Sequence, residues 1–199
     1  MAAQLDLGHR FQVGKGVPED RQEAIRFYTM AAEKGNVNAC FELGSIYESS
    51  GDKDDCKLAA EWYRKAADRG DFRAQHSLGI LYLQGLGVMR DFKTAFKLIT
   101  QAASSGDAAS MNDRSYAYMQ GLGTKQDSSK AYEWCAKAAA KEYPDALYNM
   151  GVFYEKGYYI AQDYREAAEW FSRAAEAGYP GAADKAAECR KKFTRKARH

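Results

Sequence analysis

Small and apolar residues recur along the chain at helical spacings. In one kind of segment, an alanine is followed by an apolar residue four positions on, then a glycine, and a tyrosine three further on. Ala39, Leu43, Gly44 and Tyr47 show this pattern, which starts again at Ala74. Such spacings place the residues on one helical face. Because a glycine costs a helix about 1 kcal/mol, we expect each one to mark the close approach of a neighbouring helix.

A second helical segment follows each of these, and an aspartate precedes it. Aspartate is a favoured N-cap, so we expect caps at five positions: Asp20, Asp55, Asp91, Asp127 and Asp163. Glu23 and Glu166, three residues after two of these aspartates, predict capping boxes. Apolar columns then run through the second helices and include Trp62 and Trp170. If these two tryptophans are fully buried, truncating either should cost about 3–5 kcal/mol.

The helix pair repeats along the whole chain at steps of 35 or 36 residues, and glycines such as Gly35 and Gly70 follow its second helix as C-caps. A helix pair alone cannot bury its apolar face, whereas stacked pairs can. The sequence therefore predicts an all-α solenoid in one domain, residues 1–199. We expect five repeats at about 3–38, 39–73, 74–109, 110–145 and 146–181, and a capping helix over 182–198.

This pattern resembles the Sel-one-like repeat, a relative of the tetratricopeptide repeat. The resemblance covers about residues 3–182 and implies a right-handed α/α superhelix with adaptor or scaffold roles in protein complexes. The fourth unit departs from it, with Arg114 and Ser115 in place of leucine and glycine, and Glu142 in place of the C-cap glycine. Two interpretations of Arg114 stay open: a side chain that reaches the surface, or a repeat specialised for docking a partner.

Composition adds limits to this picture. Hydrophobic residues make up 46% of the 199 residues, yet no run of eighteen apolar residues exists, so we expect no membrane span. The net charge is +2, but residues 190–199 hold six Lys or Arg and no acid. A capping helix is one interpretation of this tail, and a nuclear-import or nucleic-acid patch is another. Phe193 is its only aromatic residue, which argues against nucleic acid.

No set of residues predicts catalysis, a metal or a cofactor. The four cysteines match no zinc or C-x-x-C spacing, so we expect reduced thiols in the cytoplasm, or in the nucleus if the basic tail directs import. His9, His76 and His199 form no ligand set. Some relatives of this family are linked to β-lactam binding or hydrolysis, but the S-x-x-K at Ser50–Lys53 lacks its companion motifs.

The resemblance also suggests a binding surface. In tetratricopeptide arrays, the first helix of each pair lines the concave face, so positions two, six and nine after each starting alanine should point outward. Several of these are apolar or aromatic, as in partner sites, although some could instead fill gaps between repeats. The predicted groove comprises Phe41, Ser45, Glu48, His76, Ile80, Leu83, Asn112, Tyr116, Met119, Tyr148, Val152 and Glu155.

The leading functional hypothesis is an adaptor that binds a protein or peptide in this groove, with Glu48 and Glu155 favouring a basic partner. The alternative is a regulatory or targeting repeat domain of a larger enzyme or signalling protein. Met1 falls almost inside the first helix, and we expect Leu5, Leu7 and Phe11 to face nothing on that side. A fragment of a longer array, or self-association through the N-terminal edge, would account for this.

Overall fold

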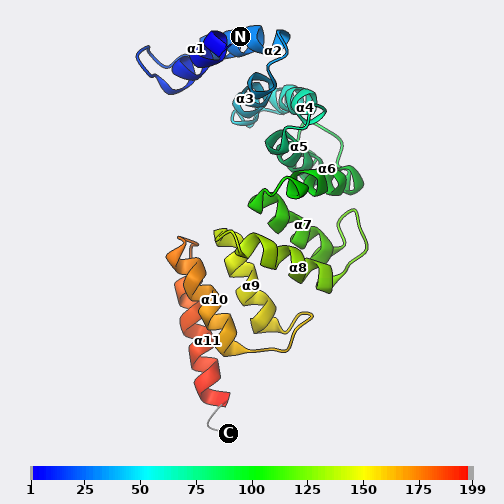
Figure 1. The fold of residues 1–199 in the computed structure, drawn as a ribbon, viewed down its shortest axis with the longest axis vertical. Coiled ribbons are helices and arrows are strands. Elements are labelled where there is room, and N and C mark those ends of the chain that lie inside the picture. The colour runs from blue at the N-terminus through cyan, green and yellow to red at the C-terminus, as the bar shows by residue number, and fades with distance from the viewer. Residues whose placement is uncertain (1, 197–199) are drawn as a thin grey trace. The chain divides into compact units, whose positions relative to one another are not determined.

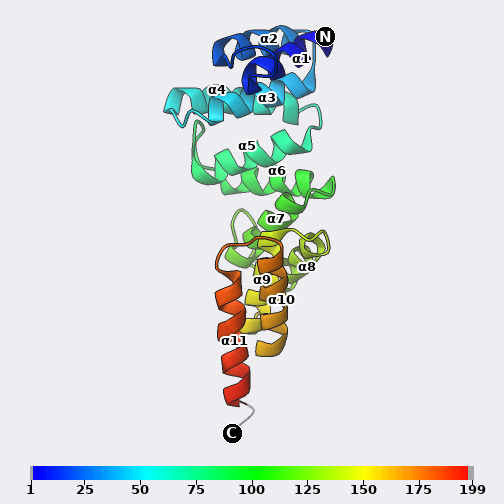
Figure 2. The ribbon, with the colours of Figure 1, turned by 90° about the vertical axis from the view of Figure 1, so that its left-hand side faces the viewer.

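The computed structural model describes residues 2–196, and its regular secondary structure in this range is helical throughout. The all-α prediction is confirmed. Figures 1 and 2 show the helices following one another as antiparallel neighbours within each pair. Their bounds are α1 Ala2–Val13, α2 Arg21–Glu33, α3 Val37–Glu48, α4 Lys53–Ala67, α5 Phe72–Gln84, α6 Phe92–Ser104, α7 Ala108–Gln120, α8 Ser128–Ala139, α9 Pro144–Lys156, α10 Tyr164–Glu176 and α11 Ala182–Lys196.

The chain forms two compact units, and the boundary between them in the sequence falls near the C-terminal end of α6. The first unit runs to Ala102 and the second starts at Ala103. Within each unit, first helices contact their own second helix, and second helices contact the next first helix. That stacking buries the apolar columns between successive pairs. The extent of a single domain over residues 1–199 stays a prediction.

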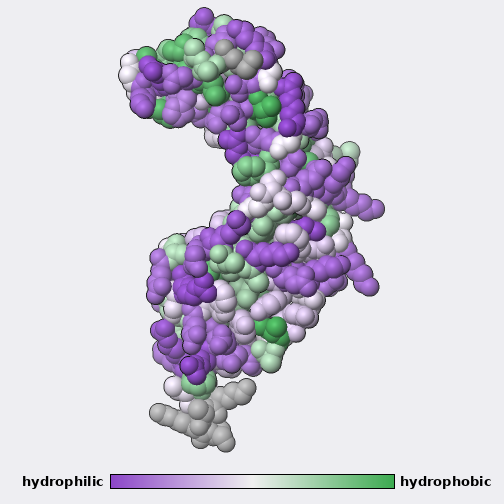
Figure 3. Space-filling model, viewed as in Figure 1, coloured by the Kyte–Doolittle hydropathy of each residue, from purple (hydrophilic) through white to green (hydrophobic). Residues whose placement is uncertain are grey.

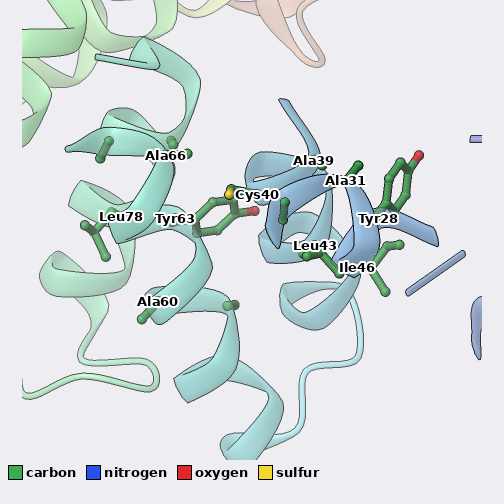
Figure 4. Packing of buried hydrophobic residues seen from close by; sticks show 14 of the residues in the cluster. Tyr28, Ala31, Ala39, Cys40, Leu43, Ile46, Ala60, Tyr63, Ala66 and Leu78 are labelled. Carbon is green, nitrogen blue, oxygen red and sulfur yellow. The ribbon is translucent and has the colours of Figure 1, made fainter. Parts of the chain in front are cut away.

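Glycines in the first helices lie directly against large side chains of the second helices. A Cβ built on Gly44 would meet the Tyr63 ring at 2.5 Å, and one on Gly151 would meet the Phe171 ring at 2.7 Å. Tyr63 is fully buried, and Figure 4 shows its ring reaching from α4 to Cys40 on α3. The predicted close approach is confirmed, because no larger residue than glycine fits beneath these rings.

In the fourth helix pair, different residues form the contact that a glycine and a large side chain form in the others. Ser115 stands at the glycine position of α7, and Cys135 replaces the aromatic residue of α8. Both are buried, and the Ser115 hydroxyl donates a 2.6 Å hydrogen bond to the carbonyl of Ala131. The smaller cysteine side chain leaves the space that the serine occupies. The larger residue at the glycine position is therefore compensated by a smaller residue at the position of the large side chain.

The tryptophan column is less buried than expected. Trp62 and Trp170 are half-buried at the surface of the second helices. Lys65 lies 3.6 Å above the ring centroid of Trp62, and Arg173 lies 4.3 Å above that of Trp170. The neighbouring column, which includes Tyr63, is the one that is fully buried. The expected cost of 3–5 kcal/mol for truncating Trp62 or Trp170 therefore does not hold, because these tryptophans keep part of their surface in water.

Arg114 also lies against a tryptophan. Its guanidinium carbon is 3.9 Å from the ring centroid of Trp134 and 5.7 Å from that of Tyr118. The side chain is half-buried in this position. A cation–π contact of this kind lets an arginine occupy the leucine position without burying its whole charge.

Aspartate side chains cap four of the five second helices as predicted. Asp20, Asp91, Asp127 and Asp163 each accept hydrogen bonds from backbone N–H groups of the following helix. The prediction for Asp55 is wrong, because α4 begins earlier. Asp52 is its N-cap, and Asp55 lies inside the first turn, where it pairs with Arg21 at 2.8 Å. The shorter turn of the second unit brings the helix start forward.

The predicted capping boxes are wrong in their second half. The backbone N–H of Asp20 donates to the carbonyl of Phe11, and that of Asp163 donates to the carbonyl of Tyr154. Glu23 instead pairs with Arg26 at 3.0 Å. The N–H groups that the glutamates were expected to satisfy already bond to the preceding helix, which ties each second helix to its first.

Glycines end most of the second helices in the left-handed conformation, with φ of 86° at Gly35 and Gly70. Glu142 takes the same conformation in the fourth unit, with φ of 56°. The next residues start the first helices, where Asn36, Asp71 and Asp107 act as N-caps. This turn explains how each pair connects to the following one.

The last helix, α11, closes the second unit. Its Ala186 and Cys189 are buried and form one apolar cluster with Ala168 and Phe171 of α10. The prediction of a C-terminal capping helix is confirmed up to Lys196, and its remaining residues lie outside the described range. Within the first unit, the expectation of an unpacked N-terminal edge is wrong. Phe11 stacks on Phe27 with ring centroids 5.6 Å apart, and Leu5 is half-buried against the core.

Candidate functional site

The twelve predicted groove residues lie on four first helices, six in each unit. Helices α3 and α5 carry six of them in the first unit, and α7 and α9 carry six in the second. Figure 3 shows one face of the molecule, on which hydrophobic residues form small patches separated by hydrophilic ones. Exposed apolar surface on this face is therefore local, so each unit has its own candidate site.

A hollow of about 290 Å³ lies between α7 and α9 in the second unit. It brings together three of the predicted residues, Tyr116, Met119 and Val152. Tyr116 is 55% exposed and Tyr158 is 45% exposed, so two aromatic rings border the hollow with much of their surface in solvent. The complete lining is Ser115, Tyr116, Met119, Gln120, Asn149, Val152, Phe153 and Tyr158.

Backbone geometry and one polar contact hold this hollow in place. Gly157 ends α9 in the left-handed conformation, and the N–H of Tyr158 donates to the carbonyl of Phe153 at 3.2 Å. The Tyr158 ring then meets the Phe153 ring edge-on at 6.5 Å. Asn149 of α9 donates a 2.9 Å hydrogen bond to Asn112 of α7. The Asn149–Asn112 hydrogen bond joins the two helices, and the turn after α9 places the Tyr158 ring at the hollow.

Two predicted groove residues of the second unit are buried instead of outward-facing. Asn112 is 8% exposed and accepts the hydrogen bond from Asn149. Glu155 is 4% exposed, and its carboxylate pairs with Lys192 at 3.0 Å and Lys185 at 3.7 Å. Because α11 supplies both lysines, Glu155 is matched within the chain. The expectation that it attracts a basic partner is wrong.

Tyr148, a third predicted residue of this unit, has a packing role. Its ring stacks on Tyr179 with centroids 4.3 Å apart and lies 5.0 Å from that of Phe171. Val152, which also lines the hollow, belongs to the same apolar cluster around Phe171. Of the aromatic residues predicted in the groove of this unit, Tyr116 is the exposed one.

In the first unit, the column that contains Glu48 serves the fold. The Tyr63 hydroxyl donates a 2.6 Å hydrogen bond to Glu48, and the Tyr28 hydroxyl does the same to Gln12. Burial and the Glu48 carboxylate raise the pKa of Tyr63. Glu48 is therefore a partner for a buried tyrosine, not a free acid. The sequence contained a sign of this. The column holds a polar residue, Gln12 or Glu48, in the two repeats whose second helix has a tyrosine, but Leu83 in the third repeat, whose second helix has none there.

The remaining predicted residues of the first unit are half-buried. Phe41 packs against Tyr63 with ring centroids 5.7 Å apart, and the guanidinium carbon of Arg73 lies 4.2 Å from its ring centroid. Ser45 lines a polar hollow of about 190 Å³ with Arg21. His76, Ile80 and Leu83 lie along α5 and line none of the hollows described in this section.

A second large hollow, of about 360 Å³, lies on the first-helix side of the first unit. Glu42 and Arg73 line it, together with His9 and Asn38. His9 stands in one of the predicted columns, six positions after the first starting alanine. Glu42 stands one position beside Phe41, and Asn38 and Arg73 each stand directly before a starting alanine, so these three were outside the columns. Tyr158 of the other hollow was missed for a different reason, since it lies in a turn and helical periodicity gives no information there.

The residues considered for catalysis have structural surroundings. Ser50 is exposed and its hydroxyl donates to the carbonyl of Tyr47, while Lys53 begins α4. All four cysteines are free and buried, and burial raises the pKa of Cys135 to about 12. Among residues 2–196, no three histidine, cysteine or acidic side chains gather as metal ligands would. His199 lies outside this range.

The basic α11 carries both apolar and charged side chains. No helix in the described part of the chain has the length and apolar character needed to cross a bilayer. On α11, Phe193 is 44% exposed. Lys192 of the same helix is engaged with Glu155 and Glu188, so part of the tail's charge is neutralised within the chain.

The repeat geometry agrees with a known family. The model of the Sel1 repeat matches five successive segments, residues 2–36, 37–71, 72–107, 108–143 and 144–179. The chain belongs to the Sel1 repeat family. Each matched segment contains one first helix and one second helix, and the array is a helical repeat solenoid.

Solved structures of Sel1 repeat proteins superpose closely. A protective antigen of uropathogenic Escherichia coli strains with this fold is 30% identical over 98% of the chain, with a TM-score of 0.84. A Sel1 repeat protein from Oxalobacter formigenes is 32% identical over 89% of the chain, with a TM-score of 0.82. The chain spans 46% of the length of the former protein and 73% of the latter.

An immunity protein from Pseudomonas aeruginosa shares the fold at 21% identity, with a TM-score of 0.58; the match covers 90% of this chain and 67% of that protein. At this identity the likeness concerns the fold alone. Sel1 repeat proteins are generally non-enzymatic scaffolds for protein–protein interaction.

Proposed function

We propose that this chain is a protein-interaction scaffold that holds an apolar or aromatic segment of a partner protein in the hollow between α7 and α9. The exposure of Tyr116 and Tyr158, at 55% and 45%, is the observation that carries the proposal. Both line the hollow beside half-buried Met119 and Val152. Exposed apolar side chains around a hollow are typical of binding sites.

The chemistry of the lining supports this occupant. Tyrosine is among the residues that most often contribute large binding energies at interfaces, and methionine adapts to differently shaped apolar partners. Gln120 is exposed beside them and can form hydrogen bonds with a partner's backbone. A segment with one or two aromatic or aliphatic side chains would therefore fit better than a charged one.

The test is a selection of peptides from a random displayed library, with the full chain as the target. We expect enrichment of peptides with aromatic or aliphatic residues, and a loss of affinity of at least about tenfold in the Tyr116→Glu, Tyr158→Glu double variant, since hot-spot truncations cost this much or more. Tyr148 is unsuitable for this purpose because it packs in the core.

Met89→Glu is the matched control, because Met89 is 87% exposed and belongs to the first unit. Its affinity for the selected peptides should equal that of the wild type. Circular dichroism must show unchanged helicity in all variants. Equal binding by the wild type and the double variant would contradict the proposal, and so would a library that yields no binder.

The proposal extends to a reducing compartment, which we expect to be the cytoplasm. Four free and buried thiols support it, since secreted proteins of this size more often pair their cysteines. Fluorescence microscopy of the tagged chain in its native cell tests the location. Accumulation in the nucleus would favour the interpretation of the basic tail as a nuclear-import signal. A role of the chain in signalling stays a prediction.

A further inference from the structure

The hollow of the first unit differs in chemistry from that of the second. It measures about 360 Å³ and is bounded by four helices of three successive repeats. Both apolar and ionisable side chains face it. Its lining is Ala2, Leu5, Asp6, His9, Tyr28, Asn38, Glu42 and Arg73.

The positive charge in this hollow is already matched. Arg73 forms a bond of 2.6 Å to one oxygen of Asp71 and another of 3.2 Å to the second oxygen. It also donates to the side-chain oxygen of Asn38 at 2.8 Å, and its guanidinium covers the Phe41 ring. With its charge balanced and several donors engaged, Arg73 forms a fixed wall of the hollow.

One negative charge, that of Glu42, lacks a direct ion pair among the described residues. Glu42 is half-buried, and its carboxylate interacts through space with Arg73 and His9 but forms no direct hydrogen bond or ion pair within residues 2–196. Asp6 is paired with Arg10 at 2.8 Å and is mostly exposed. Burial raises the pKa of Glu42, even though Arg73 and His9 oppose that effect. A partly desolvated carboxylate without a direct hydrogen bond or ion pair is unfavourable, so an external cation would be attracted to it.

The rest of the lining suits a long cationic side chain. Ala2 and Leu5 provide apolar surface next to the carboxylate, and the Tyr28 ring adds an aromatic wall. Lysine and arginine combine an apolar stem with a charged end, so they can contact both parts at once. A small inorganic cation would leave the apolar surface in contact with water.

We propose that this hollow binds a lysine or arginine side chain of a partner protein, with Glu42 as its counter-ion. The site lies in the first unit and does not depend on the apolar hollow between α7 and α9. It would make the scaffold selective for partners with a basic residue. The acidic groups first expected to serve this purpose, Glu48 and Glu155, are occupied within the chain.

The test uses the full chain and the capped peptide acetyl-Ala-Arg-Ala-amide, titrated by amide-detected nuclear magnetic resonance. The arginine peptide should shift the resonances of Glu42, Asn38 and nearby α1 residues. Replacement of arginine by citrulline, which keeps the shape but lacks the charge, should weaken binding by about tenfold, in line with the loss of a charged hydrogen bond. Glu42→Gln should weaken binding of the arginine peptide by a similar factor.

Glu61→Gln is the matched control, because Glu61 is an exposed glutamate of α4 outside the hollow. It should bind the arginine peptide as the wild type does. Equal affinities for the arginine and citrulline peptides on the wild-type chain would overturn the proposal, whether or not the Glu42 variant folds. Shifts confined to residues outside this hollow would overturn it as well. Neither result would bear on the hollow between α7 and α9.

Discussion

At the scale of single residues, the contact between a first-helix glycine and a second-helix ring organises each repeat. Gly44 lies under Tyr63 and Gly151 lies under Phe171, with no space for a Cβ. Ser115 and Cys135 change both sides of the contact together. Two positions far apart in the sequence are thus coupled by volume, and the coupling can be measured.

Cys135→Phe should lower the free energy of unfolding by about 1–3 kcal/mol, because the ring would enter the space of Ser115. Adding Ser115→Gly should recover about 1 kcal/mol or more, as expected for coupled neighbours. Urea unfolding followed by circular dichroism measures both. Ser172→Gly on α10, another helical serine bonded to a carbonyl, should give no recovery in the Cys135→Phe background.

Cysteine reactivity is a second prediction at this scale. The pKa of Cys135 is raised to about 12 by burial, and burial also raises the pKa values of Cys40, Cys56 and Cys189. A raised pKa keeps a thiol protonated at pH 8, and the thiolate is the reactive form. Maleimide labelling of the native chain should therefore be slow at pH 8, whereas all four thiols should react in denaturant. Mass spectrometry counts the labels, and rapid native labelling of Cys135 would contradict its burial.

At the scale of elements, turn length decides where a helix begins. The second unit lacks the G-x-G turn, so α4 starts at Lys53 with Asp52 as its cap. The aspartate that matches the other caps in the repeat alignment, Asp55, pairs with Arg21 of α2 instead. One residue type in one repeat column thus has two different roles.

Asp52→Ala should cost about 1 kcal/mol through loss of the cap, and this cost should persist in an Arg21→Ala background. Asp55→Ala should cost about 0.2–1 kcal/mol as an ion-pair loss, and its effect should disappear when Arg21 is already alanine. Thermal unfolding of the double-mutant set distinguishes the two roles. An Asp55 effect that is independent of Arg21 would indicate a capping role after all.

At the scale of the whole molecule, α11 covers the apolar face of the fifth helix pair. Its apolar side covers Phe171 and Ala168, and its lysines match the buried charge of Glu155. A solenoid needs such a terminal element because each repeat otherwise leaves an apolar face in water.

Deleting residues 182–199 should lower the melting temperature by several degrees or more and promote aggregation, because the face of α10 becomes exposed. The control is Lys191→Gln with Arg195→Gln, which removes charge from exposed positions of α11 and leaves its packing intact. This control should melt as the wild type does. Differential scanning calorimetry and light scattering measure both effects, and an unchanged truncated chain would show that α11 is dispensable.

The apolar periodicity, the glycines and the aspartates determined the helix order, most caps and the repeat length. These features depend on local spacing, which is visible in a sequence. The four unpaired cysteines and the capping role of residues 182–196 were predictable for the same reason. Asp52 was missed because a shortened turn moves a boundary without changing the residue type.

Which side chains are free to bind a partner was decided by the tertiary structure. Glu48 and Glu155 satisfy the pattern of a groove, yet a tyrosine hydroxyl and two lysines bind them, whereas the carboxylate of Glu42 has no such direct contact within residues 2–196. Exposure of this kind depends on contacts between residues up to 37 positions apart. Periodicity identifies the face of a helix, but only the packed neighbours decide which groups on that face remain available.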